Sequence, residues 1–238
     1  MSATNGGLYL VWDWNGTLFD DRSLLFQSIA ATLQQWGYGE PSSAEIVAKF
    51  TRPLRALFER LIGGKLSSQD WGRLERDFHN IYQGELSRGA LVPDVHQALV
   101  RGRAQAQGQA LLSQWPHGDL LEIIRRHRLT GFFDEVWGRS EDCQNKEDRI
   151  GDLLHRNRLS PDRVVLIGDT QDDIAAATAA GIGSVLVVGA SLARLDPSDV
   201  AAMAVPVAHS PAEAVELALH LAGRRGRVPT AGTDETRS

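Results

Sequence analysis

Cysteine is almost absent from this sequence, which has one, Cys143, among its 238 residues. A single thiol excludes a disulfide framework and any zinc site built from several thiolates, and it fits a reducing compartment. A chain of this length buries roughly 70% or more of the surface that it exposes when unfolded, so its core needs neither kind of cross-link. We therefore expect a globular, cytoplasmic protein.

Long apolar runs and an excess of positive charge are also missing. No apolar run approaches the ~18 residues that cross a bilayer, and the first seven residues lack the basic and apolar regions of a secretory signal. Basic residues number 25 against 30 acidic ones, for a formal net charge of −5. This balance argues against binding to nucleic acid or to an anionic membrane surface. It is compatible with any oligomeric state.

Lysine is nearly as rare as cysteine. Of the 25 basic residues, 22 are arginine, and the three lysines are Lys49, Lys65 and Lys146. In such a chain, a lysine at a chemically informative place is less easily explained as one of many solvated surface cations. This scarcity draws attention to Lys146, which opens a predicted helix.

The first part of the chain combines one predicted strand with a long helical block. Residues 8–12 form a short apolar run of β-forming residues, which predicts a buried strand. Residues 20–90 then have apolar residues at helical spacing, interrupted by glycine and proline. We expect a small helical domain with helices over 23–36, 44–50, 54–62 and 70–86.

From residue 93 the pattern changes to alternating strands and helices. Strands are predicted over 109–113, 135–138, 163–167 and 184–188, and helices over 95–107, 117–128, 146–157, 172–180 and 211–222. Such alternation predicts βαβ units and a parallel sheet covered on both faces. The predicted fold is a doubly wound, Rossmann-like α/β core of residues 1–19 and 91–222, with residues 20–90 inserted as an all-helical cap. The polar residues 223–238 predict a disordered tail.

Chemically informative residues stand at the ends of three predicted strands, where reactive groups lie in open α/β sheets. The first strand ends at Asp13, the second at Ser113 and the fourth just before Asp169. Asp13 is a candidate nucleophile, because a carboxylate can accept a phosphoryl group. Asp13 and Asp169, on neighbouring strands, are candidate Mg²⁺ ligands, while Ser113 and Lys146 can bind phosphoryl oxygens. Together they predict a phosphoryl-transfer site.

Each of these residues alone has a simpler explanation. An Asp-x-x-Gly-Thr run is often only a turn, a serine after a strand often caps a helix, and the acids of 169–173 are typical of a helix N-terminus. Their order along the chain, each at a strand end or a helix start, favours the phosphate site.

The set of motifs resembles the haloacid dehalogenase-like hydrolases over about residues 8–222. The run 13–18 (Asp-Trp-Asn-Gly-Thr-Leu) is similar to the first family motif, Ser113 to the second, Lys146 to the third and 168–173 to the fourth. The helical block resembles the cap of the phosphoglycolate-phosphatase-like branch. The resemblance implies a Mg²⁺-dependent phosphatase that acts on a small phosphorylated metabolite through an aspartyl phosphate on Asp13.

The resemblance also implies roles for single residues. Asp169 and the backbone carbonyl of residue 15 would bind Mg²⁺, and Asp173 would support the metal waters or Lys146. The candidate catalytic residues are Asp13, Asn15, Ser113 and Lys146. The candidate metal ligands are Asp13, Asn15, Asp169 and Asp173. The candidates for binding phosphate or substrate are Thr17, Ser113, Gln114, Lys146 and Arg52.

Arg52 is a candidate because it lies between two predicted cap helices and precedes Pro53, which biases it toward an extended backbone. An arginine there can clamp a carboxylate or phosphate with two hydrogen bonds, or it is simply a surface loop residue. Trp14 and Trp115, next to motif residues, are candidate walls of the pocket.

Asn15 departs from the family pattern, which has a second aspartate there as general acid and base. A carboxamide exchanges no proton at pH 7, and losing such help typically lowers the rate about 10²–10⁴-fold. Three explanations stay open. The leaving group departs unprotonated, as with an acyl phosphate; another acid acts, from Asp20, Asp21 and His79; or the chain is a non-catalytic phosphate-binding or regulatory protein.

A fourth alternative is cleavage of a C–P bond, because branches of the family with that chemistry also lack the second aspartate. A phosphonatase would need a cap lysine to form an imine, and Lys49 and Lys65 are the candidates.

Overall fold

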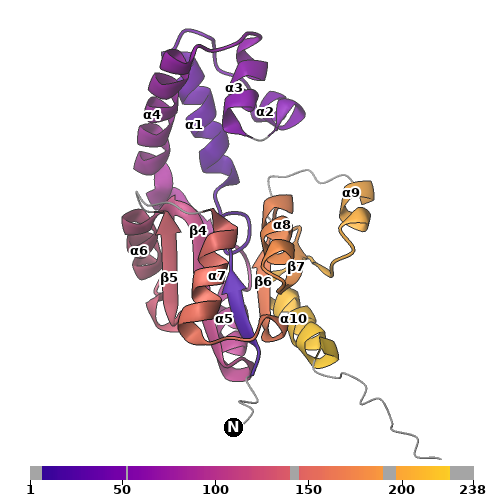
Figure 1. The fold of residues 1–238 in the computed structure, drawn as a ribbon. Coiled ribbons are helices and arrows are strands. Elements are labelled where there is room, and N and C mark those ends of the chain that lie inside the picture. Colours follow the sequence, from indigo (N-terminus) through magenta and orange to yellow (C-terminus); the bar gives the residue numbers. More distant parts are fainter. Residues whose placement is uncertain (1–6, 52, 140–144, 190–196, 226–238) are drawn as a thin grey trace, which may run out of the picture.

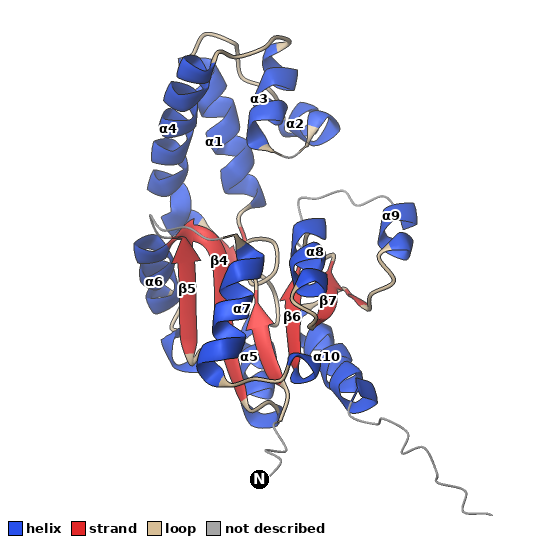
Figure 2. Ribbon diagram, in the orientation of Figure 1, coloured by secondary structure: helices blue, strands red, loops and turns tan. Residues whose placement is uncertain are grey.

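The structure, a computed structural model, describes residues 7–51, 53–139, 145–189 and 197–225. It has a six-stranded parallel sheet with helices on both faces, and a group of four helices above the carboxyl ends of the strands (Figures 1 and 2). This is the doubly wound α/β fold with an all-helical insertion that the sequence predicts. Within the described residues, no helix is both long and apolar enough to span a membrane.

The sheet has the strand order β5-β4-β1-β6-β7-β8. Its strands are β1 (Tyr9–Trp12), β4 (Gly108–Pro116), β5 (Glu135–Arg139), β6 (Val164–Gly168), β7 (Gly183–Val187) and β8 (Val207–Ala208). Every residue of β1, β6 and β7 is buried, which explains why these strands are continuous apolar runs in the sequence. The prediction missed β8, because two residues carry no recognisable pattern.

Helices cover the two faces of the sheet unequally. One face packs against α5 (Val95–Gln105), α6 (His117–Arg126) and α10 (Pro211–Arg225), and the other against α7 (Lys146–Asn157) and α8 (Gln171–Ala179). Leu10 and Trp12 of β1 point to the first group and Tyr9 and Val11 to the second, as the alternation of a strand requires. The short α9 (Pro197–Ala202) precedes β8.

The end of the chain differs in part from the prediction. Helix α10 continues to Arg225, three residues beyond the predicted end at Ala222; the next proline, which would stop a helix, is Pro229. Residues 226–238 of the predicted tail lie outside the described residues. In the part of the chain that the structure describes, three 3₁₀ turns complete the core and its junction with the helical group: η1 (Leu86–Arg88), η2 (Thr130–Phe132) and η3 (Pro161–Arg163).

The helical insertion, as we call α1–α4, consists of α1 (Arg22–Gln35), α2 (Ser43–Lys49), α3 (Leu54–Ile62) and α4 (Ser68–Glu85). Serine side chains at positions 42 and 67 cap the first turns of α2 and α4. The chain enters the insertion through β2 (Phe19–Asp20) and leaves it through β3 (Ala90–Leu91), which pair antiparallel. The sequence did not predict this pair, which spans both expected domain boundaries.

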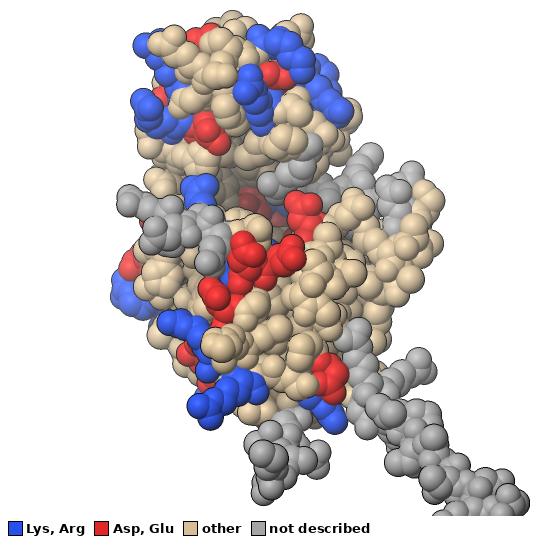
Figure 3. Space-filling model, viewed as in Figure 1, with Lys and Arg blue, Asp and Glu red and all other residues tan. Residues whose placement is uncertain are grey.

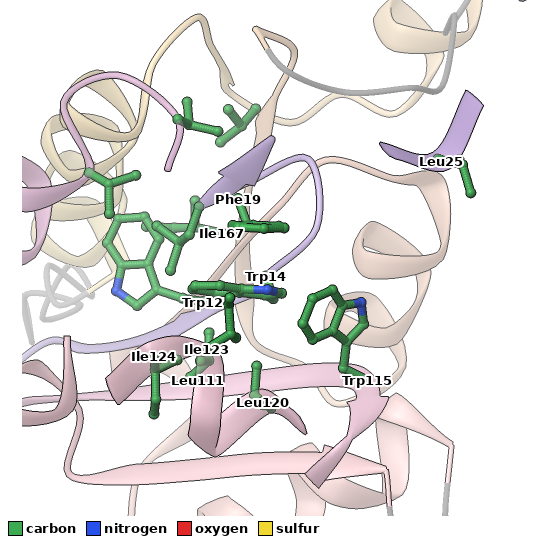
Figure 4. Close-up of a cluster of buried hydrophobic side chains, with 14 of the residues drawn as sticks. Trp12, Trp14, Phe19, Leu25, Leu111, Trp115, Leu120, Ile123, Ile124 and Ile167 are labelled. Atoms are coloured by element: carbon green, nitrogen blue, oxygen red, sulfur yellow. The ribbon is translucent and has the colours of Figure 1, made fainter. Parts of the chain in front are cut away.

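Aromatic rings continue the core from the sheet into the helical insertion (Figure 4). The Trp14 ring is fully buried and stacks on Phe19, with 5.2 Å between centroids. Trp115 packs edge-on against both rings and also against Tyr82 of α4, 6.0 Å away. Trp14, a candidate wall of the pocket, is therefore a packing residue, because no part of it is exposed. Trp115 lies at the junction of sheet and insertion.

Candidate active site

Strand pairing brings Asp13 and Asp169 to the same edge of the sheet. Asp13 follows β1, Asp169 follows the adjacent β6, and the Asp13 backbone N–H donates to the Ile167 carbonyl at 2.9 Å. Both carboxylates are buried, with 8% and 4% of the residue exposed. Asp173, in the first turn of α8, joins them: each of the three residues offers a carboxylate oxygen within 4.8 Å of the others.

Lys146 lies among these carboxylates, at the first position of α7. Its Nζ is 2.6 Å from Oδ1 of Asp13 and also pairs with Oδ1 of Asp173. Its side chain is 10% exposed. One ammonium against three buried carboxylates leaves an excess of negative charge, which is costly in a buried place unless a cation offsets it. The set of oxygen donors fits a hard divalent cation such as Mg²⁺.

The pKa values of these groups reflect burial opposed by pairing. Burial raises the pKa of Asp13 to about 6, although the charge of Lys146 works against the shift. For Asp173, the effects of Lys146 and of hydrogen bonds from Thr170 outweigh burial and hold the pKa below its usual value. Burial lowers the pKa of Lys146, but the two carboxylates more than compensate and raise it. Lys146 therefore stays charged at neutral pH.

Asp173 has two roles at the start of α8. Its Oδ2 accepts hydrogen bonds from the backbone and hydroxyl of Thr170, and Thr170 Oγ1 accepts from the Asp173 N–H in return. This reciprocal cap is the simple explanation that the sequence allowed. Oδ1 is meanwhile turned to Lys146, so capping and charge pairing coexist in one side chain.

Exposed acids surround the site where α7 and α8 begin. Figure 3 shows acidic side chains gathered on this face, at the hollow between the helical insertion and the sheet. Glu147, Asp148 and Asp172 are the exposed acids of the two first turns. At these helix N-termini their negative charges interact favourably with the helix dipoles, and they add negative electrostatic potential next to the carboxylate cluster.

The loop after Asp13 explains the Gly-Thr part of the first motif. Gly16 has φ +74°, and a Cβ on it would lie 2.1 Å from Oδ2 of Asp169. Only glycine therefore fits without moving that carboxylate. Thr17 is fully buried, and its hydroxyl donates to Oδ2 of Asp13 at 3.4 Å.

We predicted that Ser113 ends its strand, but it lies inside β4. The strand continues to Pro116. Its pairing with β5 shifts register after Leu112 and resumes at Pro116. Within this irregularity Ser113 is buried, and its Oγ accepts the Trp115 N–H at 3.1 Å. Gln114, next to it, is exposed.

The Asn15 side chain binds Asp21, directly before the helical insertion, and Tyr82, within it. Its Nδ2 donates to Oδ2 of Asp21 at 2.9 Å and to the hydroxyl of Tyr82 at 3.3 Å. The Tyr82 hydroxyl donates to the same oxygen of Asp21 at 2.5 Å. Burial and the charge of Asp21 raise the pKa of Tyr82 well above its usual value, so the phenol keeps its proton. Tyr82 was not a candidate, because a tyrosine on an apolar helix face is typical of a core residue.

The other candidates contact different partners. Asp20 accepts two hydrogen bonds from the guanidinium of Arg22. Nδ1 of His79 lies 2.7 Å from the Glu75 carbonyl, one turn earlier in α4.

The two lysines that were candidates in the insertion do not join the carboxylate cluster either. Lys65 pairs with Glu59 at 2.7 Å and has a side chain that is 90% exposed, while Lys49 is exposed in the last turn of α2. Arg52 lies outside the described residues.

Comparison with known proteins places this chain in a family. The family model "Haloacid dehalogenase-like hydrolase" matches residues 10–187. The phosphoglycolate phosphatase of Aliivibrio fischeri is 26% identical over 187 residues, which are 74% of this chain and 81% of that protein. The phosphoglycolate phosphatase of Escherichia coli O157:H7 is 26% identical over 159 residues, which are 63% of either chain.

Solved structures show the same fold. A haloacid dehalogenase-like family hydrolase from Streptococcus pneumoniae superposes with a TM-score of 0.75 at 20% identity, covering 88% of this chain and 97% of that one. A predicted phosphoglycolate phosphatase from Haemophilus somnus gives 0.75 at 19% identity, covering 90% and 99%. With the match to the family model over most of its length, the chain belongs to the haloacid dehalogenase-like hydrolases.

Proposed function

We propose that this protein is a Mg²⁺-dependent phosphatase that hydrolyses a small phosphorylated metabolite through an aspartyl phosphate on Asp13. The observation that carries the proposal is the buried cluster of Asp13, Lys146, Asp169 and Asp173 at the carboxyl edge of the sheet. Relatives named phosphoglycolate phosphatase support a phosphate ester as the substrate class.

In the proposed reaction, a carboxylate oxygen of Asp13 attacks phosphorus while the bond to the leaving oxygen breaks. That oxygen takes up a proton and departs as an alcohol. Water then attacks phosphorus, so that inorganic phosphate leaves and the Asp13 carboxylate is restored. Lys146, already paired with Asp13, and Ser113 would hold the phosphoryl oxygens and offset their growing charge.

Mg²⁺ would be held by Asp13 and Asp169, with the backbone carbonyl of residue 15 as a further ligand and Asp173 beside them. When bound, it supplies positive charge that offsets the carboxylates and the phosphoryl group. The three carboxylate oxygens within 4.8 Å of one another support this assignment.

We infer that Asp21 provides the acid that Asn15 cannot. Of the three alternative acids, Asp21 is the one whose carboxylate contacts the side chain of residue 15 in the described structure. Asp20 is engaged by Arg22, and His79 by its own helix. Asp21 is also 4% exposed. It would enter the reaction protonated, donate that proton to the leaving oxygen and take one back from the attacking water.

The helical insertion would act as the cap that closes over the substrate. It contacts the core through Tyr82, which binds Asn15, and through Gln83, which donates to Asp119 of α6 at 2.8 Å. Closure would exclude water during transfer, and reopening would release the products.

The test is phosphate release from a panel of alkyl phosphates, acyl phosphates and one phosphonate, each with Mg²⁺ and with EDTA. We expect Mg²⁺-dependent release from at least one phosphate and none from the phosphonate, since neither Lys49 nor Lys65 joins the described cluster.

The rival function is a non-catalytic phosphate-binding protein, which the asparagine at position 15 favours. Binding of inorganic phosphate in the presence of Mg²⁺, without turnover of any member of the panel, would support the rival and contradict the phosphatase.

Gly16→Ala tests the metal site separately. The added methyl group would occupy space now filled by Asp169 and would be strained at φ +74°. We expect the Mg²⁺ concentration for half-maximal activity to rise about 10–100-fold, the usual effect of disturbing a group that orients a metal ligand. Gly72→Ala in α4, where nothing lies within 4 Å of the new methyl, is the matched control. Unchanged Mg²⁺ dependence in folded Gly16→Ala would contradict the assignment of Asp169.

A further inference from the structure

Arg149 is a buried cation that the mechanism above does not use. It lies one turn after Lys146 in α7 and is 6% exposed. Its Nη1 donates to the Ser113 carbonyl at 2.8 Å and lies 3.5 Å from the Trp137 carbonyl. A side chain of α7 thus contacts the backbone of the adjacent strands β4 and β5 close to the active-site edge.

These contacts lie where the pairing of the two strands shifts register. Regular pairing of β4 with β5 runs from Ala110 to Leu112, whose partner is Trp137, and resumes only at Pro116. Where regular strand pairing is interrupted, a buried backbone carbonyl needs a hydrogen-bond donor from elsewhere. The guanidinium supplies one to Ser113, the residue directly after the last regular pair.

The same helical turn carries the active-site lysine. Residues three apart lie on one face of a helix, so Lys146 and Arg149 point together from α7 toward the sheet. Lys146 pairs with Asp13 after β1, while Arg149 binds the backbone of Ser113 in β4. One turn of α7 therefore connects both groups that are expected to hold the phosphoryl oxygens.

We propose that Arg149 is a positioning residue of the phosphoryl-binding site, which fixes Ser113 relative to Lys146. The kinetic part rests on the proposed function. The simpler alternative is that Arg149 only stabilises the fold. The two differ in what its loss changes: phosphate affinity per folded molecule in the first case, and stability alone in the second.

The experiment compares Arg149→Met, which keeps the bulk and removes the donors, with Arg149→Lys and with Arg156→Met. Arg156 is exposed on the same helix, over the Trp137 ring, and its variant is the control. With p-nitrophenyl phosphate and Mg²⁺, we expect kcat/KM of Arg149→Met to fall about 10²-fold, the scale of a displaced site. The inhibition constant for inorganic phosphate should rise together with KM.

Two further measurements separate positioning from folding. Arg149→Lys retains the positive charge and one donor nitrogen, so its kcat/KM should fall between those of the wild type and Arg149→Met. Millimolar guanidinium should restore activity to Arg149→Ala and leave Arg156→Ala unchanged. An Arg149→Met variant with reduced melting temperature, but with the KM and phosphate affinity of the wild type, would overturn the inference and leave the phosphatase standing.

If the wild type hydrolyses nothing, the phosphatase fails, and calorimetric binding of inorganic phosphate with Mg²⁺ still tests Arg149. Weaker binding by Arg149→Met than by Arg156→Met would support the inference. Equal binding, or no phosphate binding by the wild type, would overturn it.

Discussion

Asp13→Asn is expected to lower Mg²⁺-dependent phosphate release by about 10⁴-fold or more, the scale seen when a nucleophile is removed. The amide keeps the shape of the side chain but forms no stable phosphoryl intermediate. Lys146 retains its second partner, Asp173, so the variant should remain folded and still bind inorganic phosphate. Initial rates on the best substrate of the panel, with circular dichroism as the check on folding, measure the effect.

The matched control for this variant is Asp172→Asn. Asp172 is an exposed acid of the same face, in the first turn of α8, and its loss changes the charge near the site equally. We expect its rate to stay within a few-fold of the wild type, since solvent and salt screen the field of an exposed charge. A folded Asp13→Asn that is as active as Asp172→Asn would rule out Asp13 as the nucleophile.

The site was predictable from the sequence where its geometry depends on strand ends. Parallel strands meet at one edge, so Asp13 and Asp169 come together whatever the details of packing, and Lys146 opens its helix as predicted. The same holds for the helices: α3 and α7 begin and end where their patterns indicate. Local periodicity and a topological rule were enough for this part.

Contacts that a buried side chain makes with a residue far away in the chain were not predictable. Tyr82 reaches Asn15 across 67 residues and Arg149 reaches Ser113 across 36. Both look like ordinary helix residues in the sequence. The interrupted pairing of β4 with β5, which places Ser113 inside a strand, depends on the fit of two strands and leaves no pattern in either of them.

Asp21→Asn is expected to lower kcat on alkyl phosphates by about 10²-fold or more, the usual contribution of a general acid. On acyl phosphates the loss should be small, because their leaving group needs little protonation. Asp20→Asn is the control: it removes the neighbouring acid, which pairs with Arg22 rather than with Asn15. Equal rates for the two variants on alkyl phosphates would show that Asp21 is not the acid.

Exchanging the side chains of residues 15 and 21 tests whether these two residues act as a pair. Asn15→Asp alone would set two carboxylates at hydrogen-bond distance, since Asn15 Nδ2 now lies 2.9 Å from Asp21, and we expect it to lower the free energy of unfolding. The double variant Asn15→Asp/Asp21→Asn restores one amide and one carboxylate, both within reach of the Tyr82 hydroxyl. It should recover stability by about 1 kcal/mol or more over the sum of the single changes.

Activity on alkyl phosphates should return in the same double variant, because a carboxylate then stands at position 15 itself. Urea denaturation and initial rates are measured for the four proteins of this double-mutant cycle: the wild type, the two single variants and the double variant. Additive losses in both measurements would mean that Asn15 and Asp21 act independently. In that case, turnover without an acid at position 15 would be explained by a leaving group that departs unprotonated, as from an acyl phosphate.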